Sequence, residues 1–355
     1  MIRGARAALA CAVLMLVACA DEPADSAPTK AATPDKVQRM SGPELYQSHC
    51  ALCHGDEGQG YVADNATALD NPNFLESASD EFLRSAIEHG RPGTSMSAWG
   101  SAVGGPFDDR DLDALVDTLR DFASVHPIAV DDIMVMGSAV RAQSYYDVKC
   151  KMCHGELGQG GEFVSIANPE FLAAASDGYL RHAILHGRPG TPMPAFSGML
   201  ADQIIDDLVV LIRSWQLDPV KLEAESPKWP DDPILHPDGP EPDFGEAQLV
   251  GVDAVHAALD RGERLLIADA RAPTDYVVDH ITGAVSVPFY DAEKYLDRLP
   301  KDVTIVGYCG CPHAASGALA ERLGKQGYAR VKVLDEGYFV WQKRGYPLTA
   351  GTSPE

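Results

Sequence analysis

The stretch Cys50-Ala51-Leu52-Cys53-His54 decides how the rest of the sequence is interpreted. Its pattern, C-x-x-C-H, returns 100 residues later as Cys150-Lys151-Met152-Cys153-His154. Two thiols at this spacing can form thioether bonds to the two vinyl groups of one porphyrin, and the histidine that follows can bind the iron. A redox C-x-x-C or half of a zinc site would fit a single copy, but two copies in matching surroundings favour haem.

The surroundings of the two motifs match over about 75 residues, which indicates an internal duplication. The longest shared run is His89–Met96, matched by His186–Met193, and apolar residues at helical spacing close each copy in 112–122 and 205–215. The sequence thus predicts two domains of one fold, at residues 41–123 and 134–218, and two covalently bound haem c groups. The expected thioether cysteines and proximal histidines are Cys50, Cys53, His54, Cys150, Cys153 and His154.

Short polar signals mark the expected helices of each copy. The first helix runs up to the haem motif, over 41–53 and 140–153, and a later helix follows a serine–aspartate pair, over 79–89 and 176–186. These features, together with the run Arg-Pro-Gly-Thr-x-Met, resemble class I cytochrome c domains over about residues 40–218. The resemblance implies an all-α fold for both domains and makes Met96 and Met193 the distal iron ligands.

The distal ligand of each iron has a rival in the sequence. His89 and His186 are duplicated as well, and each precedes its methionine by seven residues, so only one of each pair is expected to reach the iron. A thioether is a soft, neutral ligand that raises the reduction potential when it is paired with histidine. We favour Met96 and Met193, which lie in an irregular loop rich in glycine and proline. Six-coordinate haems leave no iron position for a substrate, which indicates electron transfer.

The first residues have the features of an export signal. Arg3 and Arg6 precede an apolar run of twelve residues, Ala7–Ala18, and this run is shorter than the ~20 residues that span a bilayer. It ends in Leu16-Val17-Ala18-Cys19, which resembles the lipobox of bacterial lipoproteins. The resemblance implies cleavage after residue 18 and acylation of Cys19, hence a lipid anchor on the periplasmic side of a bacterial membrane. An ordinary signal peptide is the alternative, and residues 19–40 are expected to form a flexible tether.

The rhythm of the sequence changes after a proline-rich, acidic linker at residues 226–246. Between residues 247 and 350, short apolar strands alternate with helical stretches, which predicts an α/β domain with a parallel sheet. The expected strands are 265–269, 284–288, 304–308 and 331–334. The expected helices are 252–259, 293–299, 314–324 and 338–344.

Three short motifs of this last domain resemble the rhodanese family: Asp269-Ala270-Arg271, the segment Tyr276–Ala284, and Gly345-Tyr346-Pro347-Leu348. The resemblance implies a nucleophilic cysteine where a strand turns into a helix, and Cys309 lies at such a position. Loop amides and a helix N-terminus can stabilise its thiolate, or a persulfide on it. Asp269 and Arg271 are expected to line the same cleft, at the carboxyl end of a neighbouring strand.

The loop after Cys309 departs from the family. It reads Cys309-Gly310-Cys311-Pro312-His313-Ala314-Ala315-Ser316, with alanine where active rhodaneses often have a basic residue. Cys311 is an additional thiol, which can resolve a sulfenic acid or persulfide on Cys309 or form a disulfide with it. A domain that only docks a partner is the alternative, and a metal site that includes His313 lacks an evident fourth ligand.

The charge of the chain favours some partners over others. There are 29 basic and 52 acidic side chains, for a net charge of −23. Such a surface repels nucleic acid and attracts redox partner proteins that have a basic docking face. We predict a periplasmic dihaem cytochrome c that transfers single electrons, with a rhodanese-like domain that binds or handles sulfane sulfur at Cys309. Two enzymatic functions stay open: an oxidoreductase that takes sulfur from thiosulfate, sulfide or a persulfide and passes electrons to the haems, and a sulfurtransferase.

Overall fold

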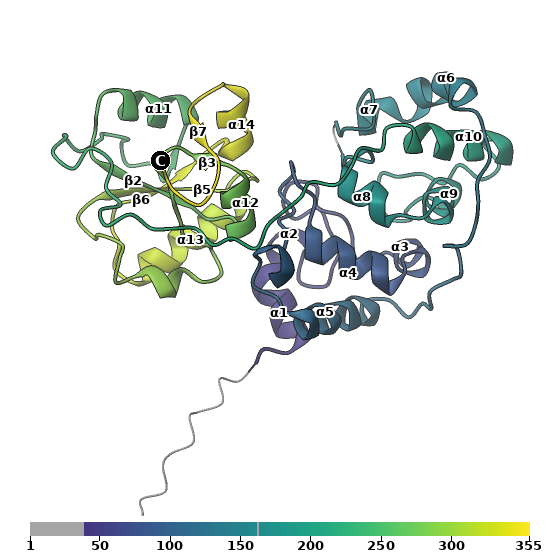
Figure 1. Ribbon diagram of the computed structural model, residues 1–355, viewed down its shortest axis with the longest axis horizontal. Helices are drawn as coiled ribbons and strands as arrows, with labels where there is room; N and C mark the ends of the chain where they lie inside the picture. The colour runs from purple at the N-terminus through teal and green to yellow at the C-terminus, as the bar shows by residue number, and fades with distance from the viewer. Residues whose placement is uncertain (1–38, 162) are drawn as a thin grey trace, which may run out of the picture. The chain divides into compact units, whose positions relative to one another are not determined.

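The structure is a computed structural model that describes residues 39–161 and 163–355 (Figure 1). The expected signal peptide, Cys19 and nearly all of the expected tether lie outside the described residues. By their contacts, Met40–Glu355 form one compact unit. Within the described part of the chain, no helix is both long enough and apolar enough to cross a membrane.

The two expected helical domains have the same succession of α-helices. The first contains α1 (Gly42–His49), α2 (Ala51–His54), α3 (Pro72–Ser77), α4 (Asp80–His89), the 3₁₀ turn η1 (Ser101–Val103) and α5 (Asp109–Asp121). The second contains α6 (Ala139–Lys149), α7 (Lys151–His154), α8 (Pro169–Ala174), α9 (Asp177–His186) and α10 (Asp202–Arg213). In each domain the last helix packs against the first, α5 on α1 and α10 on α6 (Figure 1).

The first expected helix of each domain is interrupted at the haem motif. We predicted single helices over 41–53 and 140–153, whereas Cys50 and Cys150 each separate two helices. The Cys53 and His54 amides both donate to the Cys50 carbonyl, at 3.1 and 2.9 Å, and so begin a new turn. This separate turn gathers both thiols and the histidine of the motif on one short segment.

Side-chain caps begin the short helices. Ser79 and Ser176 each accept a hydrogen bond from the amide three residues further on, at 3.2 and 3.0 Å, which confirms the expected starts of α4 and α9. The helices α3 and α8 were not predicted, although Asn-Pro is a helix-start signal. Asn71 and Asn168 cap them in the same manner, at 3.2 and 3.1 Å.

In each helical domain, an arginine near the end of the last helix donates hydrogen bonds to the C-terminal end of the third helix. Arg120 of α5 donates to the carbonyls of Leu75 and Ala78 at the end of α3, at 2.5 and 2.6 Å, and to the Asp80 carboxylate at 2.8 Å. Arg213 of α10 makes the equivalent contacts in the second domain. Since a helix leaves its last carbonyls unsatisfied, these guanidinium groups replace a C-terminal cap.

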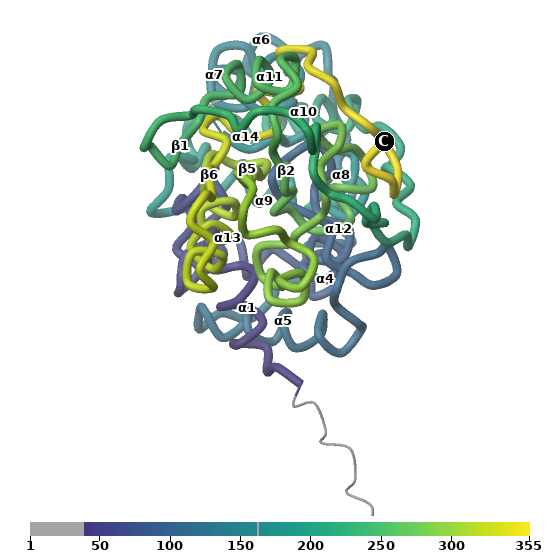
Figure 2. The backbone as a smooth tube through the Cα atoms, turned by 90° about the vertical axis from the view of Figure 1, so that its left-hand side faces the viewer, coloured from purple at the N-terminus to yellow at the C-terminus, as the bar shows by residue number. Residues whose placement is uncertain are grey.

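The third region is built on a five-stranded parallel sheet of order β1-β6-β5-β2-β4 (Figure 2). Its strands are β1 (Leu249–Val250), β2 (Leu265–Asp269), β4 (Val285–Ser286), β5 (Thr304–Tyr308) and β6 (Val331–Leu334). The helices α11 (Val252–Asp260), α13 (Ala314–Lys325) and α14 (Gly337–Lys343) agree with the expected ones. Every residue of β2 and β5 is buried, as is typical of central parallel strands.

Some elements of this region differ from the expectation. The helix predicted over 293–299 is wrong, because only a 3₁₀ turn, η2 (Ala292–Tyr295), forms there. The Tyr328 hydroxyl donates to the carbonyls of Leu296 and Leu299 at 2.9 and 3.1 Å. These bonds fix residues 296–299 in a non-helical conformation. Four elements were not predicted: the edge strand β1, α12 (Pro273–Val278) and the antiparallel pair β3 (His280–Ile281) and β7 (Leu348–Thr349).

The chain over residues 226–246 is extended, and it is fixed on the third region. Leu235 and Leu265 exchange backbone hydrogen bonds of 2.8 and 3.2 Å at the start of β2. The Trp229 indole donates to the Ser286 carbonyl at 3.0 Å. This segment therefore connects the helical and α/β regions without a helix of its own.

We expect Arg120→Lys to destabilise the first helical domain by about 2–3 kcal/mol, because a lysine cannot satisfy two carbonyls and a carboxylate from one planar group. Thermal unfolding followed by circular dichroism measures the effect. Arg110→Lys is the matched control, since Arg110 lies on the same helix and is exposed. Equal Tm values for the two variants would contradict the role assigned to Arg120.

Candidate functional site

The two candidate iron-binding histidines are held in the same way. His54 Nδ1 donates to the Thr67 carbonyl at 2.8 Å, and His154 Nδ1 donates to the Val164 carbonyl at 3.0 Å. Each bond leaves Nε2 as the unprotonated ring nitrogen, which is the one that can bind iron. Burial lowers the pKa of both histidines, which keeps the imidazoles neutral and fit to be ligands.

Thiols and methionines complete an equivalent donor set in each domain. The four candidate thioether cysteines are partly buried, and none of them forms a disulfide: Cys50, Cys53, Cys150 and Cys153. Met96 and Met193 are partly buried against the core. Each ends a tight loop, in which the Arg91 amide donates to the Met96 carbonyl at 2.8 Å and the Arg188 amide to the Met193 carbonyl at 2.9 Å. Two thiols, a neutral imidazole and a thioether in each domain fit a haem c.

The rival distal ligands have different surroundings. Met193 packs against the core, whereas His186 is exposed and its ring lies 4.4 Å from the ring of His182. His89 is partly buried at the C-terminus of α4. On these grounds Met96 and Met193 stay our candidates for the distal ligands.

The loop that carries each candidate methionine is bound by the other domain. The Asn71 amide, which caps α3, also donates to the Pro189 carbonyl in the second loop at 2.8 Å. In return, the Asn168 amide, which caps α8, donates to the Pro92 carbonyl in the first loop at 3.1 Å. The two domains thus exchange equivalent hydrogen bonds, as expected for a local twofold relation between duplicated units.

Two arginines of the same loops reinforce this exchange. The Arg91 guanidinium lies over the Phe171 ring of the second domain at 5.7 Å, and Arg188 lies over the Phe74 ring of the first domain at 5.7 Å. A cation over an aromatic face is stabilising, more so when both groups are desolvated. The two candidate haem-binding sets therefore share one buried interface.

Cys309 follows β5 directly, as expected, and Cys311 lies beside it. Their Sγ atoms are 3.6 Å apart, and Cys309 Sγ also lies 3.2 Å from Ser316 Oγ. Both thiols are buried, with exposed fractions of 1% and 3%. The hydrogen bond between the two thiols raises the pKa of Cys309 and lowers that of Cys311, and the amides of Ala314 and Ala315 also lower the pKa of Cys311.

The loop of residues 309–313, called the cysteine loop below, lies against the haem motif of the first helical domain. Helix α13, which directly follows this loop, contacts α2, the turn that carries Cys53, and Cys311 lies beside Cys53. Gly310 lies so close to Ser95 that a Cβ atom built on Gly310 would be 3.2 Å from Ser95 Oγ. This contact was not predicted, because no local sequence pattern indicates which surfaces of two domains meet.

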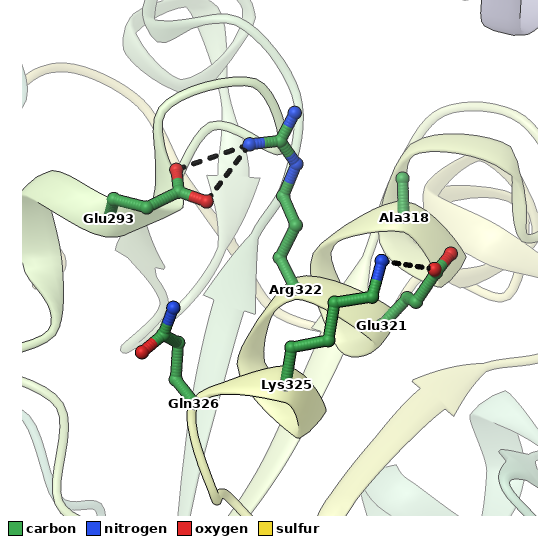
Figure 3. Close-up of a pocket in the computed structure, with 6 residues that line it drawn as sticks. All are labelled: Glu293, Ala318, Glu321, Arg322, Lys325 and Gln326. Atoms are coloured by element: carbon green, nitrogen blue, oxygen red, sulfur yellow. Dashed lines mark hydrogen bonds and ion pairs between the residues drawn. The ribbon is translucent and has the colours of Figure 1, made fainter.

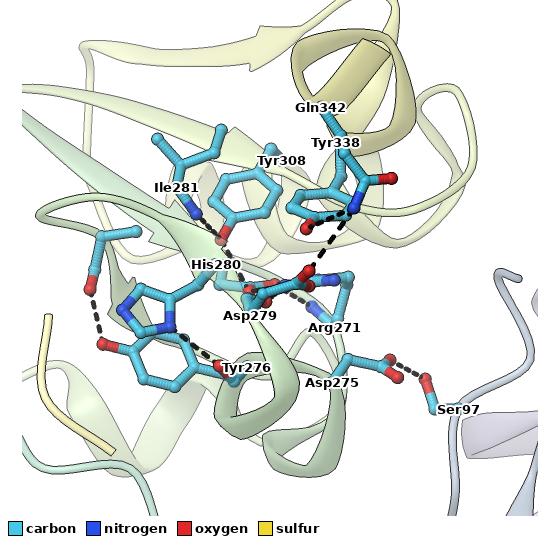
Figure 4. A network of polar contacts seen from close by, with 12 residues as sticks. Ser97, Arg271, Asp275, Tyr276, Asp279, His280, Ile281, Tyr308, Tyr338 and Gln342 are labelled. Carbon is cyan, nitrogen blue, oxygen red and sulfur yellow. Dashed lines mark hydrogen bonds and ion pairs between the residues drawn. The ribbon is translucent and has the colours of Figure 1, made fainter. Parts of the chain in front are cut away.

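Polar contacts join the α/β region to the first helical domain, next to the loop of residues 91–96. This loop and its counterpart at 188–193 are called the methionine loops. Ser97 donates to the Asp275 carboxylate of α12 at 2.5 Å (Figure 4). Thr274 Oγ1 donates to the Ala98 carbonyl at 2.9 Å. Because Ser97 and Ala98 directly follow the candidate ligand Met96, the α/β region helps to fix the course of that loop.

Asp269 and Arg271, which we predicted to line a cleft with Cys309, are bound to each other. The Arg271 guanidinium donates to Asp269 Oδ2 at 2.7 Å, and the Tyr308 hydroxyl donates to the same oxygen at 2.7 Å (Figure 4). Asp269 is fully buried. Arg271 lines a small pocket with Tyr338, but neither Asp269 nor Cys309 does. The ion pair therefore stabilises the end of β2 instead of offering a free charge to a substrate.

Another hollow of the α/β region has no chemistry of its own. Its lining is Glu293, Ala318, Glu321, Arg322, Lys325 and Gln326 (Figure 3). Its charges are paired, Arg322 with Glu293 at 3.0 Å and Lys325 with Glu321 at 2.7 Å. Among the described residues, no cluster of three His, Cys, Asp or Glu side chains is placed to hold a metal ion. The metal site considered for Cys309, Cys311 and His313 is therefore not formed.

Family models match both regions of the chain. Residues 37–117 and 137–212 match the model described as cytochrome C oxidase, cbb3-type, subunit III, and residues 252–344 match the rhodanese-like domain. The chain contains cytochrome c domains and a C-terminal rhodanese-like domain. The predicted multidomain fold is thus confirmed: helical cytochrome c domains precede an α/β rhodanese-like domain related to sulfurtransferases.

Curated relatives each match a part of the chain. A cbb3-type cytochrome c oxidase subunit CcoP of Azospirillum sp. (strain B510) is 27% identical over 191 residues, which cover 49% of this chain and 60% of that protein. A sulfurtransferase of Allochromatium vinosum is 32% identical over 88 residues, which cover 25% of this chain and 81% of that protein. A probable adenylyltransferase/sulfurtransferase MoeZ of Mycobacterium tuberculosis is 33% identical over 91 residues, or 25% of this chain and 23% of that protein. The chain therefore spans 60% of the CcoP relative's length.

We expect Met96→His to lower the reduction potential of one haem by more than about 0.1 V, since axial ligands set haem potentials over a range of about 0.8 V and methionine raises them. Optical redox potentiometry measures the change. Met199→His is the matched control, because Met199 has an exposed fraction of 60% and lies outside the repeated loop. Unchanged potentials in Met96→His would show that Met96 is not a ligand.

Proposed function

We propose that this chain is a dihaem cytochrome c that passes single electrons between redox partner proteins. The observation that carries the proposal is the exchange of hydrogen bonds between the two domains, in which Asn71 and Asn168 each donate to the methionine loop of the other domain. This exchange fixes two equivalent haem-binding sets beside each other in one chain. When bound, each haem c supplies a one-electron Fe(III)/Fe(II) couple.

The residues that would hold each haem follow from the donor sets. The thioether bonds fall to Cys50 and Cys53 in one domain and to Cys150 and Cys153 in the other, with His54 and His154 as proximal ligands. The thioethers of Met96 and Met193 fill the distal positions. With both axial positions occupied by side chains, these residues support electron transfer rather than substrate chemistry at the iron.

The second cytochrome domain presents a surface for an external partner. Val148, Met152 and Leu157 surround its haem motif, and their exposed fractions are 77%, 82% and 57%. In the first domain, Leu52 occupies the place of Met152 and is partly buried, because the rhodanese-like region packs on α2 there. Exposed apolar groups that gather in one place mark protein interaction sites. We therefore infer that electrons enter or leave the chain at the second domain.

The net charge and the N-terminal sequence support proposals for the redox partners and for the cellular location. The net charge of −23 favours redox partners that have a basic docking face and disfavours nucleic acid. The apolar run Ala7–Ala18 and the lipobox-like end at Cys19 support export to the periplasmic side of a bacterial membrane and a lipid anchor.

A role for Cys309 in sulfur handling is the second candidate function. The contact between Cys311 and Cys53 favours it, because this contact joins the sulfur site to a haem motif. With sulfide as substrate, the Cys309 thiolate would form an S–S bond to the incoming sulfur, and two electrons would leave, one to each ferric haem. Transfer of sulfur to a protein acceptor is less favoured, because both thiols are buried.

We expect Val148→Lys to slow electron transfer to a basic c-type cytochrome by about threefold to tenfold at low ionic strength, since the added cation repels the partner at the docking face. Stopped-flow spectroscopy measures the rate. Val140→Lys is the matched control, because Val140 lies on the same helix with an exposed fraction of 90%. Equal slowing by both variants would mean that the partner does not dock around the second haem motif.

The sulfur role is tested by visible spectroscopy of the anaerobic, ferric protein. Sulfide, thiosulfate or a low-molecular-weight persulfide is expected to reduce the haems, and this reduction is expected to be at least about tenfold slower in Cys309→Ser. Reduction of the variant by ascorbate shows that its haems are intact. Equal rates in the wild type and Cys309→Ser, with all three sulfur compounds, would remove the sulfur role.

A further inference from the structure

The thiols of Cys309 and Cys311 are close enough to react with each other. Their Sγ atoms are 3.6 Å apart, and a disulfide requires about 2.05 Å, so a shift of less than about 2 Å joins them. Gly310 separates the two cysteines and has no side chain that must move during this shift. The loop therefore favours a bond between neighbours over a bond to a distant thiol.

Burial limits which oxidant can reach this pair. The exposed fractions of 1% and 3% leave no room for an acceptor protein at either sulfur. The loop instead lies against the first cytochrome domain. Gly310 meets Ser95, and α13 contacts α2. Cys311 lies beside Cys53, a candidate thioether cysteine. Tyr290 packs on the same domain, with its ring 4.6 Å from that of His49 and 5.5 Å from that of Trp99. In this packing, the nearest redox site is the one that belongs to the first haem motif.

We propose that Cys309 and Cys311 form a reversible dithiol–disulfide couple that exchanges electrons with the first haem site across the Cys53 contact. The proposal rests on the dihaem function proposed above and names the redox chemistry of its sulfur site. In the oxidising direction, two S–H bonds break, one S–S bond forms, and two protons and two electrons leave the pair. Two ferric c-type haems accept the electrons, one each, which matches the two haem motifs.

The groups around the two cysteines and the haem ligands bear on the release of protons and on the direction of electron transfer. Asp64, an exposed carboxylate, interacts electrostatically with Cys311. Methionine ligation raises haem potentials, which favours electron flow from the dithiol to the haems. The disulfide form cannot take up sulfur at Cys309, so the couple also sets when that cysteine is available.

An electron count on the intact, haem-loaded chain tests this proposal. The protein is fully reduced under anaerobic conditions, freed of reductant and mixed with two equivalents of ferricyanide. Haem absorbance is followed by stopped flow, and the thiols are trapped with iodoacetamide in denaturant, which exposes both buried cysteines, and identified by mass spectrometry of the peptide that contains 309–313. We expect the haems to become ferric and then ferrous again, while Cys309 and Cys311 lose their reactivity toward iodoacetamide.

Variants distinguish disulfide formation from electron transfer across the domain contact. In Cys311→Ser the haems should stay ferric and Cys309 should stay reactive, whereas Glu321→Gln, which changes an exposed side chain of α13 and keeps both cysteines, should behave as the wild type. Tyr290→Ala opens the domain contact and should slow the return of ferrous haem by more than about tenfold.

Ferric haems that persist beside two alkylated cysteines in the wild type would overturn this proposal alone. A chain that carries no haem, or haems that ferricyanide does not oxidise, would contradict the proposed function as well. The wild-type peptide mass decides between disulfide and dithiol even if a variant fails to fold.

Discussion

The side-chain amides of Asn71 and Asn168 each bond two parts of the chain at once. The oxygen of each amide caps a short helix of its own domain, and the nitrogen donates to the methionine loop of the other domain. Because one side chain fixes both the local helix and the interface, neither can shift alone. Electron exchange between the two candidate haem sites then needs no diffusional encounter, since both sites are already positioned.

The groups around this contact explain why the domains adopt one arrangement. The rings of Phe82 and Tyr179, which occupy equivalent positions, stack at 4.6 Å between the domains. Burial lowers the pKa of Arg91 to about 10, and the guanidinium is compensated by the Phe171 ring and the Gly90 carbonyl. A buried charge is tolerated only where such partners are in place, so another packing of the domains would leave it unpaired.

Local signals in the sequence were sufficient for the elements and the donor sets. The haem motifs, the serine caps of α4 and α9 and the buried strands β2 and β5 all follow from residues within one turn or one strand. The loop geometry around Met96 and Met193 is consistent with the ligand assignment that the resemblance implied. The caps of α3 and α8 were equally local, and the Asn-Pro signal before each helix could have revealed them.

Contacts between distant segments were not predictable. Nothing near Asn71 shows that its amide reaches Pro189, and nothing near Cys311 shows that it meets Cys53. Asp269 and Arg271 were expected to face a cleft because they end a parallel strand, but two residues of opposite charge this close satisfied each other. Sequence patterns report periodicity and capping, whereas the choice of partner surface depends on the shape of the folded domains.

Hydrogen exchange of backbone amides, followed by mass spectrometry on the haem-loaded chain, tests most directly whether the cysteine loop and the first haem motif are packed together. The account predicts slow exchange in peptides that cover 309–316 and 50–54. Tyr290→Ala should speed the exchange of both peptides together, while the equivalent peptide 150–154 of the second domain stays unchanged. Fast exchange of both peptides in the wild type, or faster exchange of the cysteine loop alone in the variant, would contradict the contact on which the coupled chemistry depends.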